Sequence, residues 1–327
     1  MQGDNLRHLL RLYREMRRIR VFEDLALESH RNQEFNGYLH ASTGQEAVPV
    51  GVCAHLRPDD RLTSTHRGHG HGLAKGADAK AMMSELFGRA NGACRGKGGS
   101  MHIADFSVGM LGANGIVAGG LPIAVGAAQG LKLLGSDAVV AAFFGDGAIN
   151  RGPFLEALNW ATLYHLRVLF VCEDNGFSAF TYSDQTTRGT GPLGRARSLG
   201  IDGVTVDGDD VLAVENAARK LIDEVRNSST PRFLHARTYR WTGHTSTDVA
   251  AYRRAGELGE RQAQDPLVRL ARHLTGAGLP ASDLAEIDAA VMAVMQAARE
   301  HARASPLPPE REAYEDVQDI GAPACPA

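Results

Sequence analysis

A carboxylate and a carboxamide each follow a stretch of the chain that is predicted to be a strand. Asp146 comes just after the apolar residues 138–144, and Asn175 follows the apolar residues 168–172. Short apolar runs of this kind are typical of strands buried on both faces of a sheet. Between them, apolar residues recur at helical spacing over residues 152–165. The segment therefore predicts a strand, a helix and a second strand.

Both polar side chains are predicted to meet at one edge of the sheet. Neighbouring parallel strands lie about 4.8 Å apart, and α/β sheets bind ligands at the carboxyl ends of their strands. Carboxylate and amide oxygens suit Mg²⁺, which usually shares its coordination with a bound phosphate. The pair Asp146 and Asn175 thus predicts a magnesium–diphosphate anchor. For Gly145-Asp146-Gly147 taken alone, a turn in which Asp146 caps the following helix is the alternative.

Several motifs together resemble one known family. The stretch from Asp146 to Asn175 matches the thiamine-diphosphate signature, and five more segments occur in the family's order: residues 40–47 (HASTGQEA), 66–70 (HRGHG), 96–102 (GKGGSMH), 112–117 (GANGIV) and 238–245 (TYRWTGHT). The chain resembles the alpha subunit of the dehydrogenase component of 2-oxo acid and acetoin dehydrogenase complexes. The similarity runs from about residue 38 to residue 253, with a weaker helical tail to about residue 316.

The resemblance implies an α/β fold, in which a mostly parallel sheet is flanked by helices and binds thiamine diphosphate. A chain of 327 residues can form one such domain. We expect a single domain over residues 1–303, made of a helical N-terminal segment (1–35), a core (36–262) and C-terminal helices (263–303). Residues 304–327 contain five prolines and are expected to form an extended tail. Two stretches with little apolar periodicity, residues 178–203 and 242–260, are expected to be long loops.

The resemblance also assigns site residues. The implied cofactors are thiamine diphosphate and Mg²⁺, with the metal held by Asp146, Asn175 and the backbone carbonyl of Phe177. The implied cofactor-binding residues are His66, Arg67, Gly115, Val117, Gly145, Asp146, Gly147, Ala148, Asn175 and His244.

Individual roles follow from the same family pattern. The planar guanidinium of Arg67 suits a diphosphate oxygen, and the Gly115 carbonyl accepts from the aminopyrimidine amine, while Val117 bends the cofactor. His244 and His40 are the implied catalytic residues. His244 contacts the diphosphate near the reacting centre, and His40 orients or protonates the group derived from the substrate, because an imidazole titrates near working pH.

Four positions depart from the family pattern. His66 stands where pyruvate-type relatives usually carry Tyr, although both side chains donate a hydrogen bond. Asp174 stands where relatives usually have Asn, which adds a negative charge near the metal. Glu173 stands where some branched-chain relatives have a phosphate-binding Arg. Thr245 replaces a serine that is a regulatory phosphorylation site in some mitochondrial relatives.

Other sites that the motifs could suggest are excluded. A zinc site at His66, His69 and His71 lacks Cys or acidic ligands, and the intervening Arg67 favours an anion. A nucleotide-triphosphate loop at residues 96–99 is rejected because Gly follows the lysine and residue 91 is Asn where the first Gly belongs. The Gly-x-Gly-x-x-Gly spacing of a dinucleotide fold is also missing after residue 119.

The resemblance implies that the chain needs partners. The glutamate that activates the aminopyrimidine ring comes from a separate beta subunit in two-chain members, so we expect an α₂β₂ heterotetramer that is inactive as the isolated chain. The implied reaction cleaves acetoin, or decarboxylates pyruvate or another 2-oxo acid, and passes the acyl unit to a lipoyl-bearing acyltransferase core. The alternatives are a two-chain thiamine-dependent two-carbon transferase without a lipoyl partner, and a binding or scaffold subunit that kept only the fold.

Composition sets further limits. The net charge is −3 and no basic cluster occurs, so neither nucleic acid nor an anionic membrane is expected as a partner. The longest apolar stretch, residues 121–144, is interrupted by Lys132 and Asp137 and is not expected to span a bilayer. The N-terminal residues do not resemble a signal peptide. The four cysteines show no paired spacing, which favours a reducing cytoplasm.

Overall fold

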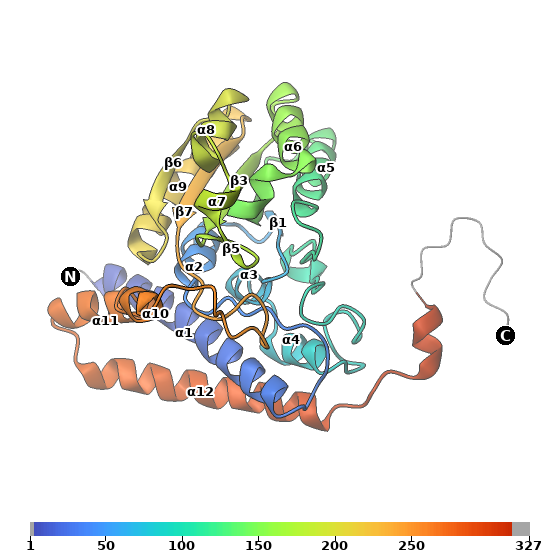
Figure 1. The fold of residues 1–327 in the computed structure, drawn as a ribbon, viewed down its shortest axis with the longest axis vertical. Coiled ribbons are helices and arrows are strands. Elements are labelled where there is room, and N and C mark those ends of the chain that lie inside the picture. The colour runs from blue at the N-terminus through green and yellow to red at the C-terminus, as the bar shows by residue number, and fades with distance from the viewer. Residues whose placement is uncertain (1–2, 316–327) are drawn as a thin grey trace.

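The centre of the fold is a five-stranded parallel sheet (Figure 1). The computed structural model describes residues 3–315. In spatial order the strands are β1 (Arg61–Thr63), β2 (Val140–Gly145), β3 (Val168–Asp174), β7 (Arg232–Arg237) and β6 (Gly203–Asp207). The sequence's strand–helix–strand prediction is confirmed, since α6 (Gly152–Leu163) connects β2 to β3 and these strands pair in parallel.

Both faces of the sheet are covered, which is why β2 and residues 168–172 of β3 are apolar. Alternate residues of a strand point to opposite faces. Val140, Ala142 and Phe144 pack in one buried cluster with α5 (Gly120–Leu133) and α6. Ala141 and Phe143 pack in another with α2 (Ala47–Cys53) and α9 (Val211–Ser228). The result is a sheet between two layers of helices, as the resemblance implied.

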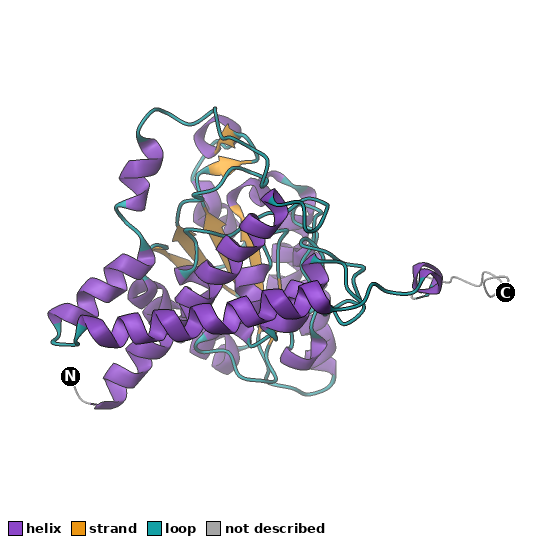
Figure 2. Cartoon of the chain, turned by 90° about the horizontal axis from the view of Figure 1, so that it is seen from below, coloured by secondary structure: helices purple, strands orange, loops and turns teal. Residues whose placement is uncertain are grey.

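The third buried cluster is formed mainly by the N- and C-terminal helices. The long helices α1 (Gly3–Arg31) and α12 (Ala281–Ala304) pack against each other and against α4 (Ala79–Leu86) and α11 (Pro266–Gly276). Figure 2, seen from below, shows the long helix α12 crossing in front of the sheet. The helical N- and C-terminal segments expected from the sequence are therefore present.

Two segments expected to be irregular contain short elements. Residues 178–203 include the hairpin β4 (Phe177–Ser178) and β5 (Thr181–Tyr182) and the helices α7 (Ser183–Thr186) and α8 (Gly191–Ser198), and α10 (Glu257–Gln262) begins within 242–260. The expectation of long loops was wrong there because elements of two to eight residues are too short to show apolar periodicity. The expected tail contains a 3-10 turn, η3 (Glu310–Tyr314), and its residues 316–327 lie outside the described part.

The glycine-rich loop after α4 wraps around a carboxylate of its own chain. Glu85 is fully buried, and its two oxygens accept hydrogen bonds of 2.7–3.1 Å from the backbone N–H groups of Cys94, Gly96, Gly98 and Gly99. These donors would otherwise suit a phosphate. Because Glu85 already accepts from these N–H groups, they are not free to bind a nucleotide phosphate.

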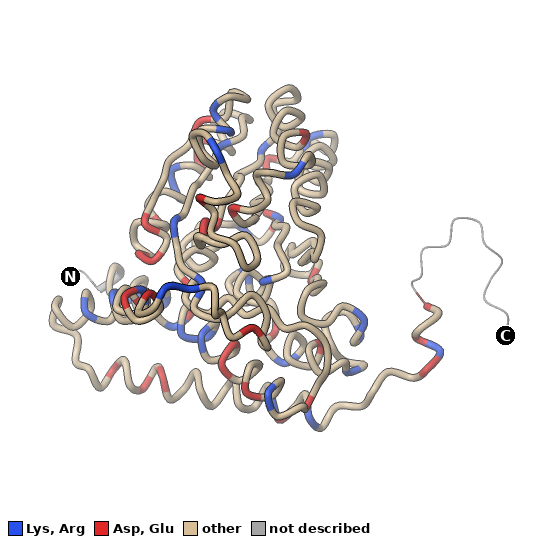
Figure 3. Tube along the Cα trace, viewed as in Figure 1, with Lys and Arg blue, Asp and Glu red and all other residues tan. Residues whose placement is uncertain are grey.

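Charges are distributed over the surface without a dominant sign. Figure 3 shows Lys and Arg interspersed with Asp and Glu along the described chain. Among residues 3–315, none of the helices combines the length and the apolar character needed to cross a membrane.

Candidate active site

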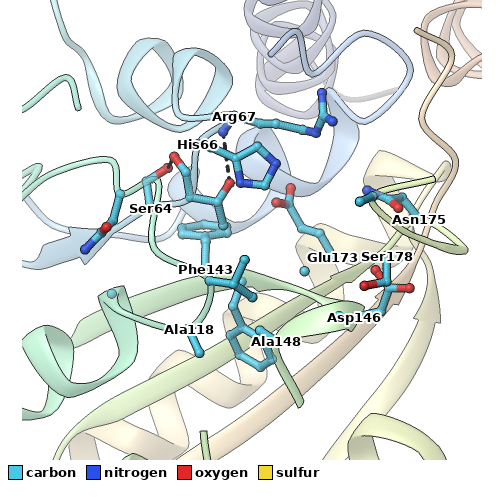
Figure 4. Close-up of a pocket in the computed structure, with 18 of the residues that line it drawn as sticks. Ser64, His66, Arg67, Ala118, Phe143, Asp146, Ala148, Glu173, Asn175 and Ser178 are labelled. Carbon is cyan, nitrogen blue, oxygen red and sulfur yellow. Dashed lines mark hydrogen bonds between the residues drawn. The ribbon is translucent and has the colours of Figure 1, made fainter. Parts of the chain in front are cut away.

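A cavity opens at the carboxyl edge of the sheet (Figure 4). Loops that follow β1, β2, β3 and β7 contribute to its wall. Most of the residues assigned from the sequence to the metal and the cofactor line this cavity. They are His66, Arg67, Val117, Gly145, Asp146, Gly147, Ala148, Asn175, Phe177 and His244. Residues more than a hundred positions apart therefore meet in one place.

Asp146 and Asn175 lie at the same end of this cavity (Figure 4). Strand pairing explains their proximity, because Gly145 of β2 is in register with Glu173 of β3 and both side chains follow within two residues. Both residues are buried. The Oδ1 atom of Asn175 accepts a hydrogen bond of 3.2 Å from the Phe177 N–H, and the Asp146 carboxylate accepts one from the Ser183 hydroxyl.

The surroundings of Asp146 favour a cation beside it. Burial, together with the charge of Asp174, raises the pKa of Asp146 well above its usual value. The Oδ2 atom of Asp174 also lies 2.8 Å from the Nε2 atom of His235 on β7. Asp174, the acidic residue that stands where relatives usually have Asn, therefore has a hydrogen-bonding partner of its own. A divalent ion at this position would favour ionised Asp146 by direct coordination. The oxygen donors present therefore fit Mg²⁺.

Two buried guanidinium groups make another part of the cavity positive. Arg67 donates to the backbone carbonyls of Ala41 and His244, both at 2.7 Å. Arg240 is 1% exposed and donates to the Ala179 carbonyl at 3.0 Å and the Tyr252 hydroxyl at 2.6 Å. Burial, followed by the charge of Arg240, lowers the pKa of Arg67. An anion such as a diphosphate would stabilise both charges.

Three imidazoles gather beside these arginines. The ring centroids of His40, His66 and His244 lie 4.8, 5.1 and 5.6 Å apart in edge-to-face pairs. Burial and then Arg67 lower the pKa of His40 to about 3 and that of His244 to about 4. The same causes lower the pKa of His66 well below its usual value. Neutral imidazoles can each donate and accept a hydrogen bond, whereas the neighbouring guanidinium charges oppose a metal cation between them.

These shifts predict a loss of stability in acid. A His whose pKa is lowered on folding binds fewer protons in the folded than in the unfolded state, so the free energy of unfolding falls as pH drops from 6.5 towards 4. We expect His40→Gln to reduce this loss, measured by urea unfolding at about pH 7.5 and about pH 5. The exposed His273→Gln variant is the control. Equal acid sensitivity in wild type and His40→Gln would contradict the assignment.

The other histidines of the 66–71 segment do not join this cluster. His69 pairs through Nδ1 with Glu23 at 2.9 Å and through Nε2 with the Ser100 hydroxyl at 3.0 Å. His71 lies between the Ser64 hydroxyl at 2.8 Å and Glu173 at 3.3 Å. Each is held by its own partners, so the zinc site excluded from the sequence is also not formed in space.

Two assigned residues do not line the cavity. His40 contacts it only through the rings of His66 and His244. Gly115 lies beside His102, whose Nε2 atom would be 3.3 Å from a Cβ built on that glycine.

The lining residues that were not assigned from the sequence include Gln45, Ser64, Glu173, Ser178 and Arg240. Gln45 and Arg240 belong to motifs that were recognised, so membership of those motifs was the available signal. Ser64 and Ser178 carry no such signal.

Comparisons with known proteins agree with this geometry. The family of the dehydrogenase E1 component matches residues 13–310. The alpha subunit of acetoin:2,6-dichlorophenolindophenol oxidoreductase from Cupriavidus necator is 44% identical over 311 residues, covering 94% of this chain and 93% of that protein. The corresponding subunit from Bacillus subtilis is 42% identical over 306 residues, covering 94% and 92%.

A pyruvate dehydrogenase relative is also similar over nearly the whole chain. The E1 component subunit alpha of pyruvate dehydrogenase from Zymomonas mobilis is 38% identical over 311 residues, covering 94% of this chain and 88% of that protein. The extent of the family match, together with the Asp146–Asn175 cavity at the sheet edge, leads to one conclusion. The chain belongs to the dehydrogenase E1 component family.

Proposed function

We propose that the chain is the alpha subunit of a thiamine-diphosphate-dependent dehydrogenase that acts on acetoin, or on pyruvate or another 2-oxo acid. The observation that carries the proposal is the cavity in which Asp146 and Asn175 lie together beneath Arg67. Family membership implies thiamine diphosphate as the cofactor. The oxygen donors of Asp146 and Asn175 support Mg²⁺ as the ion that ties its diphosphate to the protein.

Each part of the cavity has a task in this proposal. Asp146, Asn175 and the Phe177 carbonyl hold the ion, while the backbone of residues 145–148 and the side chain of Arg67 face the diphosphate. Bound thiamine diphosphate supplies a carbon nucleophile and an electron sink. His66 and His244 donate hydrogen bonds near the diphosphate.

The two implied catalytic histidines stand in different positions. His244 lines the cavity, whereas His40 lies behind it in ring contact with His244. In the proposed site His244 is the neutral donor that faces the reacting group, and His40 holds its ring in place.

A second subunit is proposed to complete the site. Ile116 and Val117 line the cavity although they are 70% and 47% exposed, so its wall continues onto an open apolar surface. Further along, the adjacent helices α5 and α6 expose Ile123, Trp160 and Leu163. Large apolar surfaces of this kind mark protein interfaces. We propose that a beta subunit covers this surface, supplies the glutamate that activates the aminopyrimidine ring, and forms an α₂β₂ assembly.

Sequence identity to the relatives favours acetoin as the proposed substrate of this chain. The two acetoin relatives are 44% and 42% identical to this chain, against 38% for the pyruvate relative from Z. mobilis. His66, which replaces the Tyr of pyruvate-type relatives, lies in the wall of the cavity. In the proposed reaction the two-carbon unit passes to a lipoyl group on an acyltransferase core.

The test is reconstitution with the beta subunit. Co-expressed α and β are expected to reduce an artificial dye with acetoin faster than with pyruvate or branched 2-oxo acids, in a reaction that requires Mg²⁺ and thiamine diphosphate. Either chain alone is expected to be inactive, because the family resemblance places the activating glutamate on the beta subunit. Turnover by the isolated alpha chain at the rate of the pair would contradict the proposal. Product formation without any lipoyl acceptor or dye would favour the two-carbon transferase.

A further inference from the structure

Gln45 is a buried amide in the cavity that none of the assigned roles uses. It lies just before α2, is 2% exposed and lines the same cavity as Asp146 and Asn175. Its oxygen Oε1 accepts a hydrogen bond of 3.1 Å from the Nδ2 atom of Asn175. Its nitrogen Nε2 is buried and has no hydrogen-bond partner. A buried donor without a partner is rare in proteins and indicates a missing ligand or water.

The contact to Asn175 fixes which way its amide points. With Nδ2 donating to Gln45, Oδ1 faces the other way and accepts from the Phe177 N–H at 3.2 Å. An amide oxygen accepts two hydrogen bonds, so one lone pair of Oδ1 is free. That lone pair is the one available to a metal ion. Gln45 therefore selects the orientation in which Asn175 can act as an oxygen ligand.

The backbone that carries Gln45 is itself held firmly. The next residue, Glu46, is fully buried and receives two hydrogen bonds from Arg20, at 2.5 and 3.0 Å, and a third from the Gly44 N–H at 3.1 Å. Gly44 has φ +94°, and a Cβ there would lie 2.4 Å from a ring atom of Trp241. These contacts fix the backbone on both sides of Gln45.

The chemistry around the unpartnered nitrogen points to an anion. Arg67 and Arg240 line the same cavity and provide its buried positive charge. An amide N–H₂ group is a donor only, so its partner must be an acceptor such as a phosphoryl oxygen. On the other side of the amide, Oε1 accepts a hydrogen bond from Asn175, the proposed metal ligand. One side chain thus faces both halves of a metal–diphosphate unit.

We propose that Gln45 is a positioning residue for the cofactor: Nε2 donates to an oxygen of the diphosphate while Oε1 orients Asn175 towards the metal. This inference rests on the proposed function, because it requires the diphosphate and the ion in this cavity.

The test compares two variants that remove different halves of the amide. Gln45→Glu keeps an acceptor for Asn175 and replaces the donor by a carboxylate oxygen. Gln45→Leu removes both the donor and the acceptor. Gln264→Glu, on an exposed residue, makes the same charge change at the surface. The proteins are studied as the co-expressed α–β assembly, and the affinity for thiamine diphosphate is measured by calorimetry with saturating Mg²⁺, alongside thermal unfolding without cofactor.

We expect Gln45→Glu and Gln45→Leu to bind thiamine diphosphate about 10- to 100-fold more weakly, as is typical for the loss of a hydrogen bond to a charged group. Gln264→Glu should bind like wild type, and the melting temperatures should stay close together. Affinities within about twofold of wild type in both Gln45 variants would overturn the inference, and weakening in Gln45→Leu alone would overturn the donor role. Failure of the wild-type assembly to bind the cofactor would instead contradict the proposed function.

Discussion

Replacing Asp146 by Ala is expected to abolish Mg²⁺-dependent binding of thiamine diphosphate while the fold is retained. The side chain is buried at the end of β2, where it is the only charged ligand among the three proposed for the metal. Residues that hydrogen-bond to a metal's ligands already contribute about 10- to 100-fold in affinity, so loss of the charged ligand itself should weaken cofactor binding by at least about 100-fold. Calorimetry of the α–β assembly, with and without Mg²⁺, measures this loss.

Asp146→Ala should weaken cofactor binding, but it should not lower the stability of the cofactor-free protein. Burial and Asp174 raise the pKa of Asp146, which means that folding disfavours its ionised form. A carboxyl with a raised pKa makes the cofactor-free protein less stable as pH rises through the range between its unfolded and folded pKa values. Removing the group should leave the melting temperature at neutral pH unchanged or higher. Asp184→Asn, an exposed change on α7, is the control. Wild-type affinity in Asp146→Ala would contradict the metal assignment.

The second large effect is expected at Glu85. Its carboxylate accepts four backbone N–H groups of the 94–99 loop, and it is fully buried. Glu85→Gln replaces one acceptor oxygen by an N–H₂ donor that faces other donors. Leaving such groups unpaired, together with losing the bonds to a charge, should lower the free energy of unfolding by about 3–5 kcal/mol. Urea unfolding at neutral pH measures this change.

The matched control for Glu85 lies on α12. Glu286→Gln makes the same substitution at an exposed position and should change stability by less than about 0.5 kcal/mol. If Glu85→Gln also fell within that range, the loop would not depend on the internal carboxylate.

The layered fold was predictable from the sequence because two of its central strands, β2 and β3, are buried on both faces. The runs that became β2 and β3, with α6 between them, have a strong periodic pattern and clear ends. The short hairpin β4–β5 and the helices α7 and α8 were not predictable in the same way. Their few residues are fixed by tertiary contacts, such as that of Ser183 with Asp146, which leave no period in the sequence.

Within the site, residues that follow strands were easier to find than residues that reach it from elsewhere. Asp146 and Asn175 were placed by the direction of two neighbouring strands alone. Arg240 and Gln45 enter the cavity from the loop after β7 and the loop before α2, and the sequence does not show that these loops meet. Glu85 was missed for a related reason, because the identity of the anion within a glycine-rich loop depends on packing between distant segments.

The central feature of the proposed site is one divalent ion that Asp146 and Asn175 bind jointly with a diphosphate. The most direct measurement is anomalous diffraction from crystals of the α–β assembly grown with Mn²⁺ and thiamine diphosphate. We expect one Mn²⁺ peak within about 2.3 Å of an Asp146 carboxylate oxygen, of Asn175 Oδ1 and of diphosphate oxygens. A peak that contacts neither side chain, or cofactor bound with its diphosphate in another cavity, would contradict it.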